Sequence, residues 1–69
     1  MFNSEMLDGL EWQQVVSQGT PAGTYRVEIT WALDHYRITV VREDRVVRRV
    51  KAWYVRTAVA KANRWLKKY

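Results

Sequence analysis

Two stretches in the middle of the chain alternate apolar and polar residues with a period of two. Within residues 24–33, the apolar positions on one side are Tyr25, Val27, Ile29, Trp31 and Leu33. Residues 35–42 alternate in the same way around Ile38 and Val40. This period is typical of a β-strand with one buried face. The pattern therefore predicts two strands over 24–33 and 35–42.

These two strands are expected to form an antiparallel hairpin with a two-residue turn at Asp34 and His35. The pairs that this turn predicts are Leu33 with Tyr36, Trp31 with Ile38, and Ile29 with Val40. Because every apolar residue then meets another, the pattern and the register agree. His35 is expected to be an exposed turn residue.

A third strand is expected over residues 45–51, after a turn at residues 43–44. Its pattern is less regular, because Arg and Val alternate imperfectly. The register stays open between two arrangements: Val40 opposite Val47 and Ile38 opposite Arg49, or Val46 and Val50 on the buried face with Arg48 between them.

The last part of the chain, over residues 53–68, shows the periodicity of an amphipathic helix. The apolar stripe consists of Val55, Val59, Ala62, Leu66 and Tyr69. The opposite side carries Arg56, Lys61, Arg64, Lys67 and Lys68. Trp53 breaks this pattern and would lie on the basic side unless the helix begins after it.

The N-terminal element, over about residues 9–18, has two possible structures. Asp8 and Glu11 have the spacing of a capping box, which favours a helix. The adjacent Val15 and Val16 favour a fourth strand instead. In either case we expect an α+β fold in which a C-terminal helix packs on a three-stranded antiparallel sheet.

The length of 69 residues fits one small domain spanning residues 1–69. A chain of this size buries only about 60% of its unfolded surface, so a free edge strand makes a homodimer plausible. The sequence has no Cys and one His, which excludes disulfides and the usual thiolate or multi-histidine metal sites. We therefore expect no metal and no cofactor.

Charge is distributed unevenly along the chain. Residues 1–23 contain three acids and no base, whereas nine of the twelve bases follow Asp44 and no acid does. Such asymmetry is typical of proteins with a polyanionic partner. The alternative interpretation is a surface charge that only keeps the protein soluble.

Catalytic chemistry has little support in the sequence. The only serines are Ser4 and Ser17 and the only histidine is His35, so no nucleophile–base–orienter set can be assembled. We therefore expect a protein that is not an enzyme. No apolar run reaches 18 residues and no base precedes an apolar N-terminal stretch. Together with the lack of Cys, these features predict a cytoplasmic protein without a membrane partner.

The candidate binding surface combines the third strand with the basic side of the helix. Lys and Arg on rigid elements are suited to contact phosphates, and an exposed Trp can stack on a base. The candidate residues are Arg48, Arg49, Lys51, Trp53, Arg56, Lys61, Arg64, Lys67 and Lys68. A secondary candidate surface is the outer face of the hairpin, with Arg26, Thr30, Arg37 and Thr39. The expected partner is DNA or RNA.

A second hypothesis is a small protein, of the kind that phages and mobile elements encode, that binds and inhibits or redirects a larger host protein. Its target would offer an acidic or nucleic-acid-binding surface. Trp53, Tyr54 and Trp65 would be the anchors of that interface, and the basic residues would set the rate of association.

If residues 9–18 are helical, the element order is α-β-β-β-α. This order is similar to that of the double-stranded RNA-binding domain, and residues 58–62 resemble its alanine-rich second helix. The chain departs from that family at residues 32–35, which lack its Gly-Pro-x-His loop, and at residues 51–54, which lack its Lys cluster. The strands and the final helix are also similar in order to the arm-binding domains of phage-type integrases.

Overall fold

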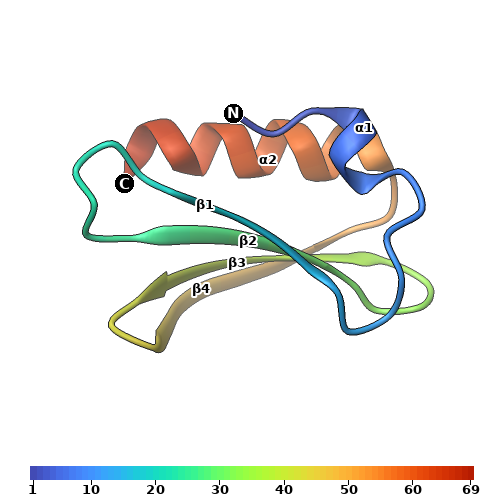
Figure 1. The fold of residues 1–69 in the computed structure, drawn as a ribbon, viewed down its shortest axis with the longest axis horizontal. Coiled ribbons are helices and arrows are strands. Elements are labelled where there is room, and N and C mark those ends of the chain that lie inside the picture. Colours follow the sequence, from blue (N-terminus) through green and yellow to red (C-terminus); the bar gives the residue numbers. More distant parts are fainter.

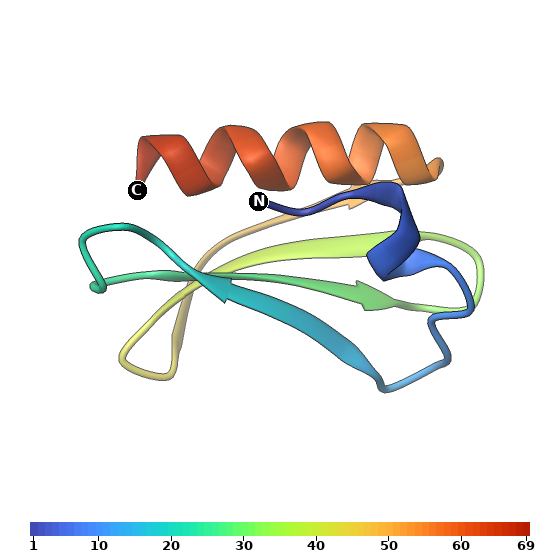
Figure 2. The same ribbon diagram turned by 45° about the horizontal axis from the view of Figure 1, so that its top comes forward.

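The computed structural model describes residues 1–69 and contains one antiparallel sheet with both helices on the same face (Figure 1). Its elements are α1 (Ser4–Leu7), β1 (Val15–Gly19), β2 (Arg26–Trp31), β3 (Tyr36–Arg42), β4 (Arg45–Ala52) and α2 (Val55–Lys68). The four strands lie in the order β1-β2-β3-β4, so each strand pairs with its neighbour in sequence. The other face of the sheet has no helix over it (Figure 2).

The core lies between α2 and the central strands β2 and β3. Val27, Ile29, Ile38 and Val40 are completely buried, as the alternating pattern predicts. Trp65 of α2 is the largest buried side chain, with 1% of its surface exposed. The expected α+β fold with a C-terminal helix on the sheet is therefore confirmed.

The N-terminal element is a strand, so the prediction of a helix over residues 9–18 is wrong and the alternative is confirmed. β1 pairs with β2 in a register that places Val16 opposite Ile29. The Asp8 capping box does not form, because Gly9 follows with a φ of 72°. The only helix here is the four-residue α1, and Asn3 caps it by accepting a hydrogen bond from the Met6 N–H.

The turn between β2 and β3 lies one residue earlier than predicted, because the Ala32 N–H donates to the His35 carbonyl at 2.8 Å and places Leu33 and Asp34 at the tip. Trp31 pairs with Tyr36 and Ile29 pairs with Ile38, which leaves residues 32–35 in the loop. The register differs from the predicted one by two residues, so each side chain keeps its face. Leu33 has a φ of 73° and is 67% exposed, instead of extending the buried row.

A β-bulge settles the open register of β4. The turn at Glu43 and Asp44 has two residues, but the pairing shifts between Val40 and Val41. Val40 then lies opposite Arg48, and Ile38 lies opposite Val50. Without this shift Arg49 would face the core, so the bulge places the partly buried Val50 against the core in its place. Neither predicted arrangement is fully correct, since Val46 pairs with Val41 on the uncovered face.

The N-terminal segment runs beside α2 and belongs to the core (Figure 1). Phe2 and Leu7 are 3% and 2% exposed. The Phe2 N–H donates to Asn63 Oδ1 at 2.7 Å, and Asn63 Nδ2 donates to the Phe2 carbonyl at 2.9 Å. These contacts connect the two ends of the sequence within one domain.

With four strands, the element order is α-β-β-β-β-α. It therefore differs from the three-stranded order on which the resemblance to double-stranded RNA-binding domains rested. α2 begins at Val55, so Trp53 precedes the helix instead of lying on its basic side. Neither helix has the length and hydropathy of a bilayer-spanning segment.

Candidate nucleic-acid interface

The outer side of α2 carries most of the candidate residues. Ala58, Ala62, Trp65 and Leu66 turn toward the sheet, which leaves the opposite side to bases. Arg56, Arg64, Lys67 and Lys68 are exposed, and Lys61 is half-buried. The helix contains no acidic residue, and its last-turn lysines also complement the partial negative charge at the helix C-terminus.

Arg48 connects β4 to this side of α2. Its guanidinium lies 4.8 Å from the centroid of the Trp65 ring, and the Lys61 ammonium lies 6.0 Å from the same ring. Both distances are within the range of cation–π interactions. The indole therefore places a strand base and a helix base on one continuous surface. We call this surface the helix basic face: Arg48, Arg56, Lys61, Arg64, Lys67 and Lys68.

Arg49 and Lys51 lie on the other side of the molecule. Consecutive residues of a strand point to opposite faces, and Val50 between them packs against the core. Arg49 and Lys51 therefore lie on the uncovered face of the sheet. There Lys51 is directly opposite Arg37, and Arg49 is directly opposite Thr39. The predicted binding residues therefore lie on two separate surfaces of the protein.

The secondary candidates also lie on the uncovered face of the sheet. Arg26 Nε donates to Glu28 Oε2 at 2.8 Å, so this base is neutralised by its own strand. Thr39 is only 5% exposed, and Thr30 is half-buried opposite Arg37. Of these candidates, Arg37 is the one charged residue without a carboxylate partner.

Trp53 is exposed, as expected, but it is not part of the helix basic face. It is 59% exposed and its ring lies edge-on against His35, with centroids 5.3 Å apart. His35 is buried and not an exposed turn residue, because it lies beyond the turn tip and its ring packs against Trp53. The Nδ1 atom of His35 lies 2.6 Å from Asp34 Oδ1, while its Nε2 atom has no partner.

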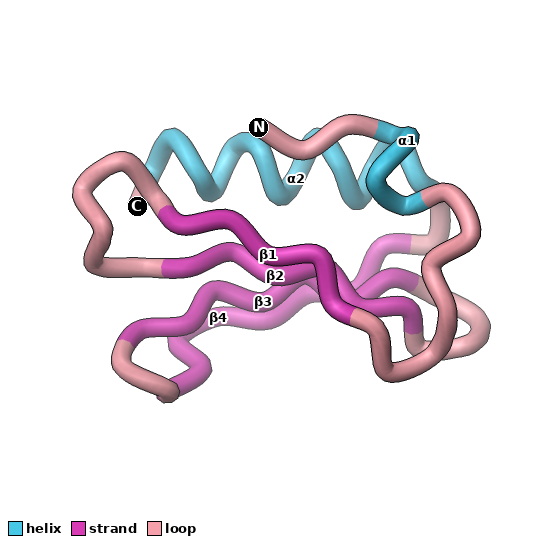
Figure 3. The backbone as a smooth tube through the Cα atoms, viewed as in Figure 1, coloured by secondary structure: helices cyan, strands magenta, loops and turns pink.

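Trp65 was a candidate anchor for a protein partner, and its burial rules out that role. Three other large aromatic side chains remain exposed: Trp12, Trp53 and Tyr54, at 58%, 59% and 72%. These residues and Leu33 belong to three segments: the segment before β1, the β2–β3 loop and the β4–α2 link. All three segments lie at the same end of the sheet (Figure 3).

Arg42 is a basic residue that the sequence analysis did not single out. Arg42 follows Ile38 and Val40 at the same two-residue spacing along β3. This spacing places it on the same face of the sheet and could have identified it from the sequence. Its guanidinium lies 5.7 Å from the centroid of the Tyr25 ring, and Tyr25 in turn lies 5.0 Å from the Tyr69 ring. Arg42 and the rings of Tyr25 and Tyr69 therefore form a second cation–aromatic group near the C-terminal end of α2.

Most Lys and Arg side chains of this protein have no carboxylate partner. Arg26 is the only one of the twelve Lys and Arg residues with a carboxylate oxygen within 4.0 Å. Every base of the helix basic face is therefore available to an external anion.

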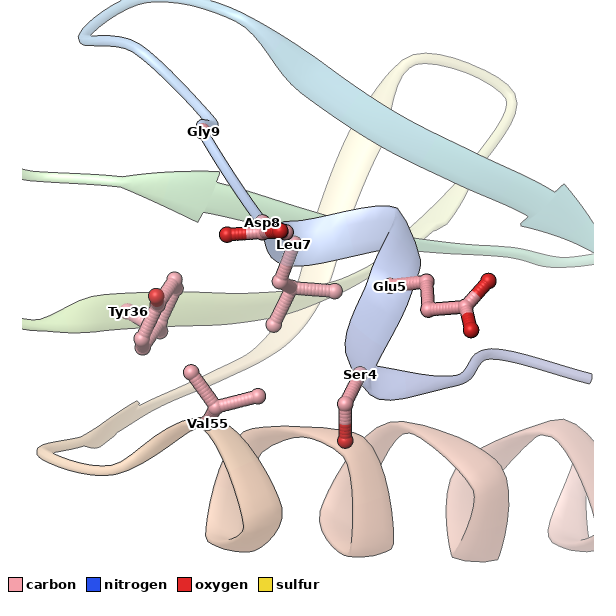
Figure 4. Close-up of a pocket in the computed structure, with 7 residues that line it drawn as sticks. All are labelled: Ser4, Glu5, Leu7, Asp8, Gly9, Tyr36 and Val55. Carbon is pink, nitrogen blue, oxygen red and sulfur yellow. The ribbon is translucent and has the colours of Figure 1, made fainter.

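The largest hollow of the surface, about 380 Å³ in volume, lies between α1 and the start of α2 (Figure 4). Leu7, Tyr36 and Val55 form its apolar wall, and Glu5 and Asp8 supply carboxylates. It has no basic lining residue, so it is not suited to bind an anion. A second, smaller hollow lies on α2 itself and is lined by Ala60, Asn63, Arg64 and Lys67.

Metal ligands do not cluster in this fold, since no three His, Asp or Glu side chains lie where they could hold one ion. No protein-family model, no curated protein and no solved structure matches this chain.

Proposed function

We propose that this protein binds the phosphate backbone of a nucleic acid through the helix basic face. The observation that carries the proposal is the lack of any carboxylate partner for the six bases of this face. Bases that are free of internal partners can release the counterions of a nucleic acid when they bind it.

The length of the face fits several phosphates. Arg56 and Lys68 are separated by about 18 Å along the helix axis, given the rise of about 1.5 Å per residue. Duplex DNA carries one phosphate per strand for about every 3.4 Å of its axis, so the face covers about five base pairs. A rigid helix holds these charges in place, which lowers the entropy that binding costs.

The first experiment is a fluorescence-anisotropy titration with duplex DNA, single-stranded DNA and duplex RNA, each at about 50 and about 200 mM NaCl. We expect binding to weaken by about a thousandfold between the two salt concentrations if six phosphates are contacted. One of the three nucleic acids that still binds tightly at the higher concentration would be the natural class of ligand.

The test variant replaces Arg64, Lys67 and Lys68 with Gln. Its matched control replaces Arg37, Arg49 and Lys51 with Gln and has the same net charge. For the test variant, the slope of log affinity against log salt should fall by about three. The control should keep the slope and affinity of the wild-type protein for a single duplex. Equal losses in both variants, or no binding by the wild type, would contradict the proposal.

A second candidate function is binding to a larger host protein. The observation that favours it is the exposure of Trp12, Trp53 and Tyr54 at one end of the sheet, because exposed aromatic residues often anchor protein interfaces. An affinity capture from host extract, with Trp53→Ala as the control, tests it. Failure to recover a partner at micromolar protein would argue against this function.

A further inference from the structure

We infer that the uncovered face of the sheet is a second phosphate-binding surface, and that the protein bridges two duplex segments of nucleic acid. This inference rests on the proposed function of the helix basic face. The second surface consists of Arg37, Arg49 and Lys51, which we call the sheet basic patch.

The register of β3 and β4 brings the three bases of the sheet basic patch together. Arg37 and Lys51 are direct cross-strand partners, so their Cβ atoms are about 5 Å apart. Arg49 lies two residues before Lys51 on the same face, at about 7 Å. The β-bulge sets this arrangement, because without it Arg49 and Lys51 would face α2.

The electrostatics of this patch favour a bound anion. None of the three bases has a carboxylate within 4.0 Å. The strands carry one carboxylate on the uncovered face of the sheet, Glu28, and it already forms an ion pair with Arg26. Like charges directly opposite each other destabilise a sheet. A phosphate between Arg37 and Lys51 would relieve that repulsion.

The shape of the uncovered face fits a duplex backbone. Both helices lie on the other side of the sheet, so no element obstructs the approach (Figure 2). The neighbours of the patch are short side chains, with Thr30 opposite Arg37 and Thr39 opposite Arg49. Arg49 and Lys51 are exposed and Arg37 is half-buried, so a ligand would meet the charged groups of Arg49 and Lys51 first.

The position of the two surfaces indicates two separate nucleic-acid segments. The helix basic face and the sheet basic patch lie on opposite sides of a domain whose Cα extents are 29 × 20 × 16 Å. Duplex DNA has a persistence length of about 50 nm, so one segment cannot wrap around so small a body without a large bending cost. The occupant of the sheet basic patch is therefore a second duplex segment.

A bridging assay tests this inference. A biotinylated duplex is fixed on streptavidin beads, protein is added at about 50 mM NaCl, and capture of a second, fluorescent duplex is measured. The wild-type protein should capture the second duplex. Capture should fall at excess protein, because each duplex then becomes saturated with its own protein molecules.

The two triple Gln variants separate the roles of the surfaces. The variant in Arg37, Arg49 and Lys51 should bind one duplex with an affinity within about threefold of wild type but capture at least about tenfold less of the second duplex. The variant in Arg64, Lys67 and Lys68 should bind one duplex more weakly than wild type and should also capture less of the second duplex. A control on the same sheet face, with Arg26→Gln and Glu28→Gln, keeps the net charge and should still bridge. Thermal unfolding of each variant checks that it remains folded.

The possible outcomes distinguish the inference from the proposed function. Binding of one duplex without capture of a second would overturn the inference alone. Capture that persists in the sheet-patch variant would also overturn it, and light scattering would then show whether a dimer forms the bridge. No binding of any duplex would overturn both proposals.

Discussion

Asn63 is the residue that attaches the N-terminal segment to α2. Its side-chain amide accepts from the N–H and donates to the carbonyl of one residue, Phe2. The two bonds close a ring that satisfies both backbone groups of Phe2, whose side chain is buried. Backbone groups that lose such partners in a buried site destabilise the folded state.

Asn63→Ala should lower the free energy of unfolding by about 1–2 kcal/mol, because both bonds to Phe2 are lost. Urea denaturation measures this change. The matched control is Thr57→Ala, an exposed substitution on the same helix that gains similar helix propensity without removing a hydrogen bond. Equal stability of the two variants would contradict the role assigned to Asn63.

Individual residues also show where sequence reasoning reached its limit. Trp65 lies between the apolar stripe and the basic side of α2, so its helical position alone did not decide its burial. Its neighbours decided it, since Arg48 and Lys61 cover the ring from two elements. His35 is buried because the turn lies one residue earlier than the local pattern predicts, so that His35 is no longer at its tip.

Among the elements, the turn between β3 and β4 has a left-handed backbone conformation that Glu43 does not favour. Glu43 and Asp44 have φ values of 48° and 65°. Two successive positive φ values are typical of a type I′ turn, for which Asn-Gly is the preferred sequence. The left-handed region costs an ordinary L-residue about 1–2 kcal/mol.

Replacing Glu43 with Asn and Asp44 with Gly should therefore raise the free energy of unfolding by about 1 kcal/mol. Chemical denaturation provides the measurement. A variant with Glu43→Gln and Asp44→Ser loses the same two charges without the favourable turn residues, and it should not be stabilised. A gain in both variants would assign the effect to charge instead of backbone conformation.

The elements with a clear period were predicted well, and the irregular ones were not. β2, β3 and α2 follow from alternation or helical spacing, because half-buried elements must present one apolar face. β1 was uncertain because a capping box and a valine pair favoured different structures, and pairing with β2 decided between them. The bulge in β4 escaped prediction because it depends on the competition between Val50 and Arg49 for the core.

For the whole molecule, the dominant feature is unbalanced positive charge. The formal net charge is +5, and Arg26 is the only Lys or Arg residue with a carboxylate partner. The composition predicted this excess, but the folded sheet was needed to show that the bases form two surfaces. Because side chains alternate along β4, Arg48 lies on the helix basic face and Arg49 lies on the sheet basic patch. Repulsion among these charges lowers the stability of the compact state.

Raising NaCl from about 20 to about 150 mM should increase Tm by about 3–6 °C, because salt screens this repulsion over about 10 Å. Scanning calorimetry at neutral pH tests this expectation. The variant in Arg37, Arg49 and Lys51 should show a smaller increase, since it has lost a repulsive cluster. A Tm that falls with added NaCl would show that attractive ion pairs dominate instead.

The bulge in β4 also affects how the gene can change in length. Val47 is the residue without a regular partner in β3, between the pairs Val41–Val46 and Val40–Arg48. In a regular hairpin, loss of one codon turns the following side chains to the opposite face. Loss of the Val47 codon would instead straighten the strand and leave Arg48 and Arg49 on their present surfaces. A single-codon deletion at this position of the strand should therefore not exchange charge between the two faces.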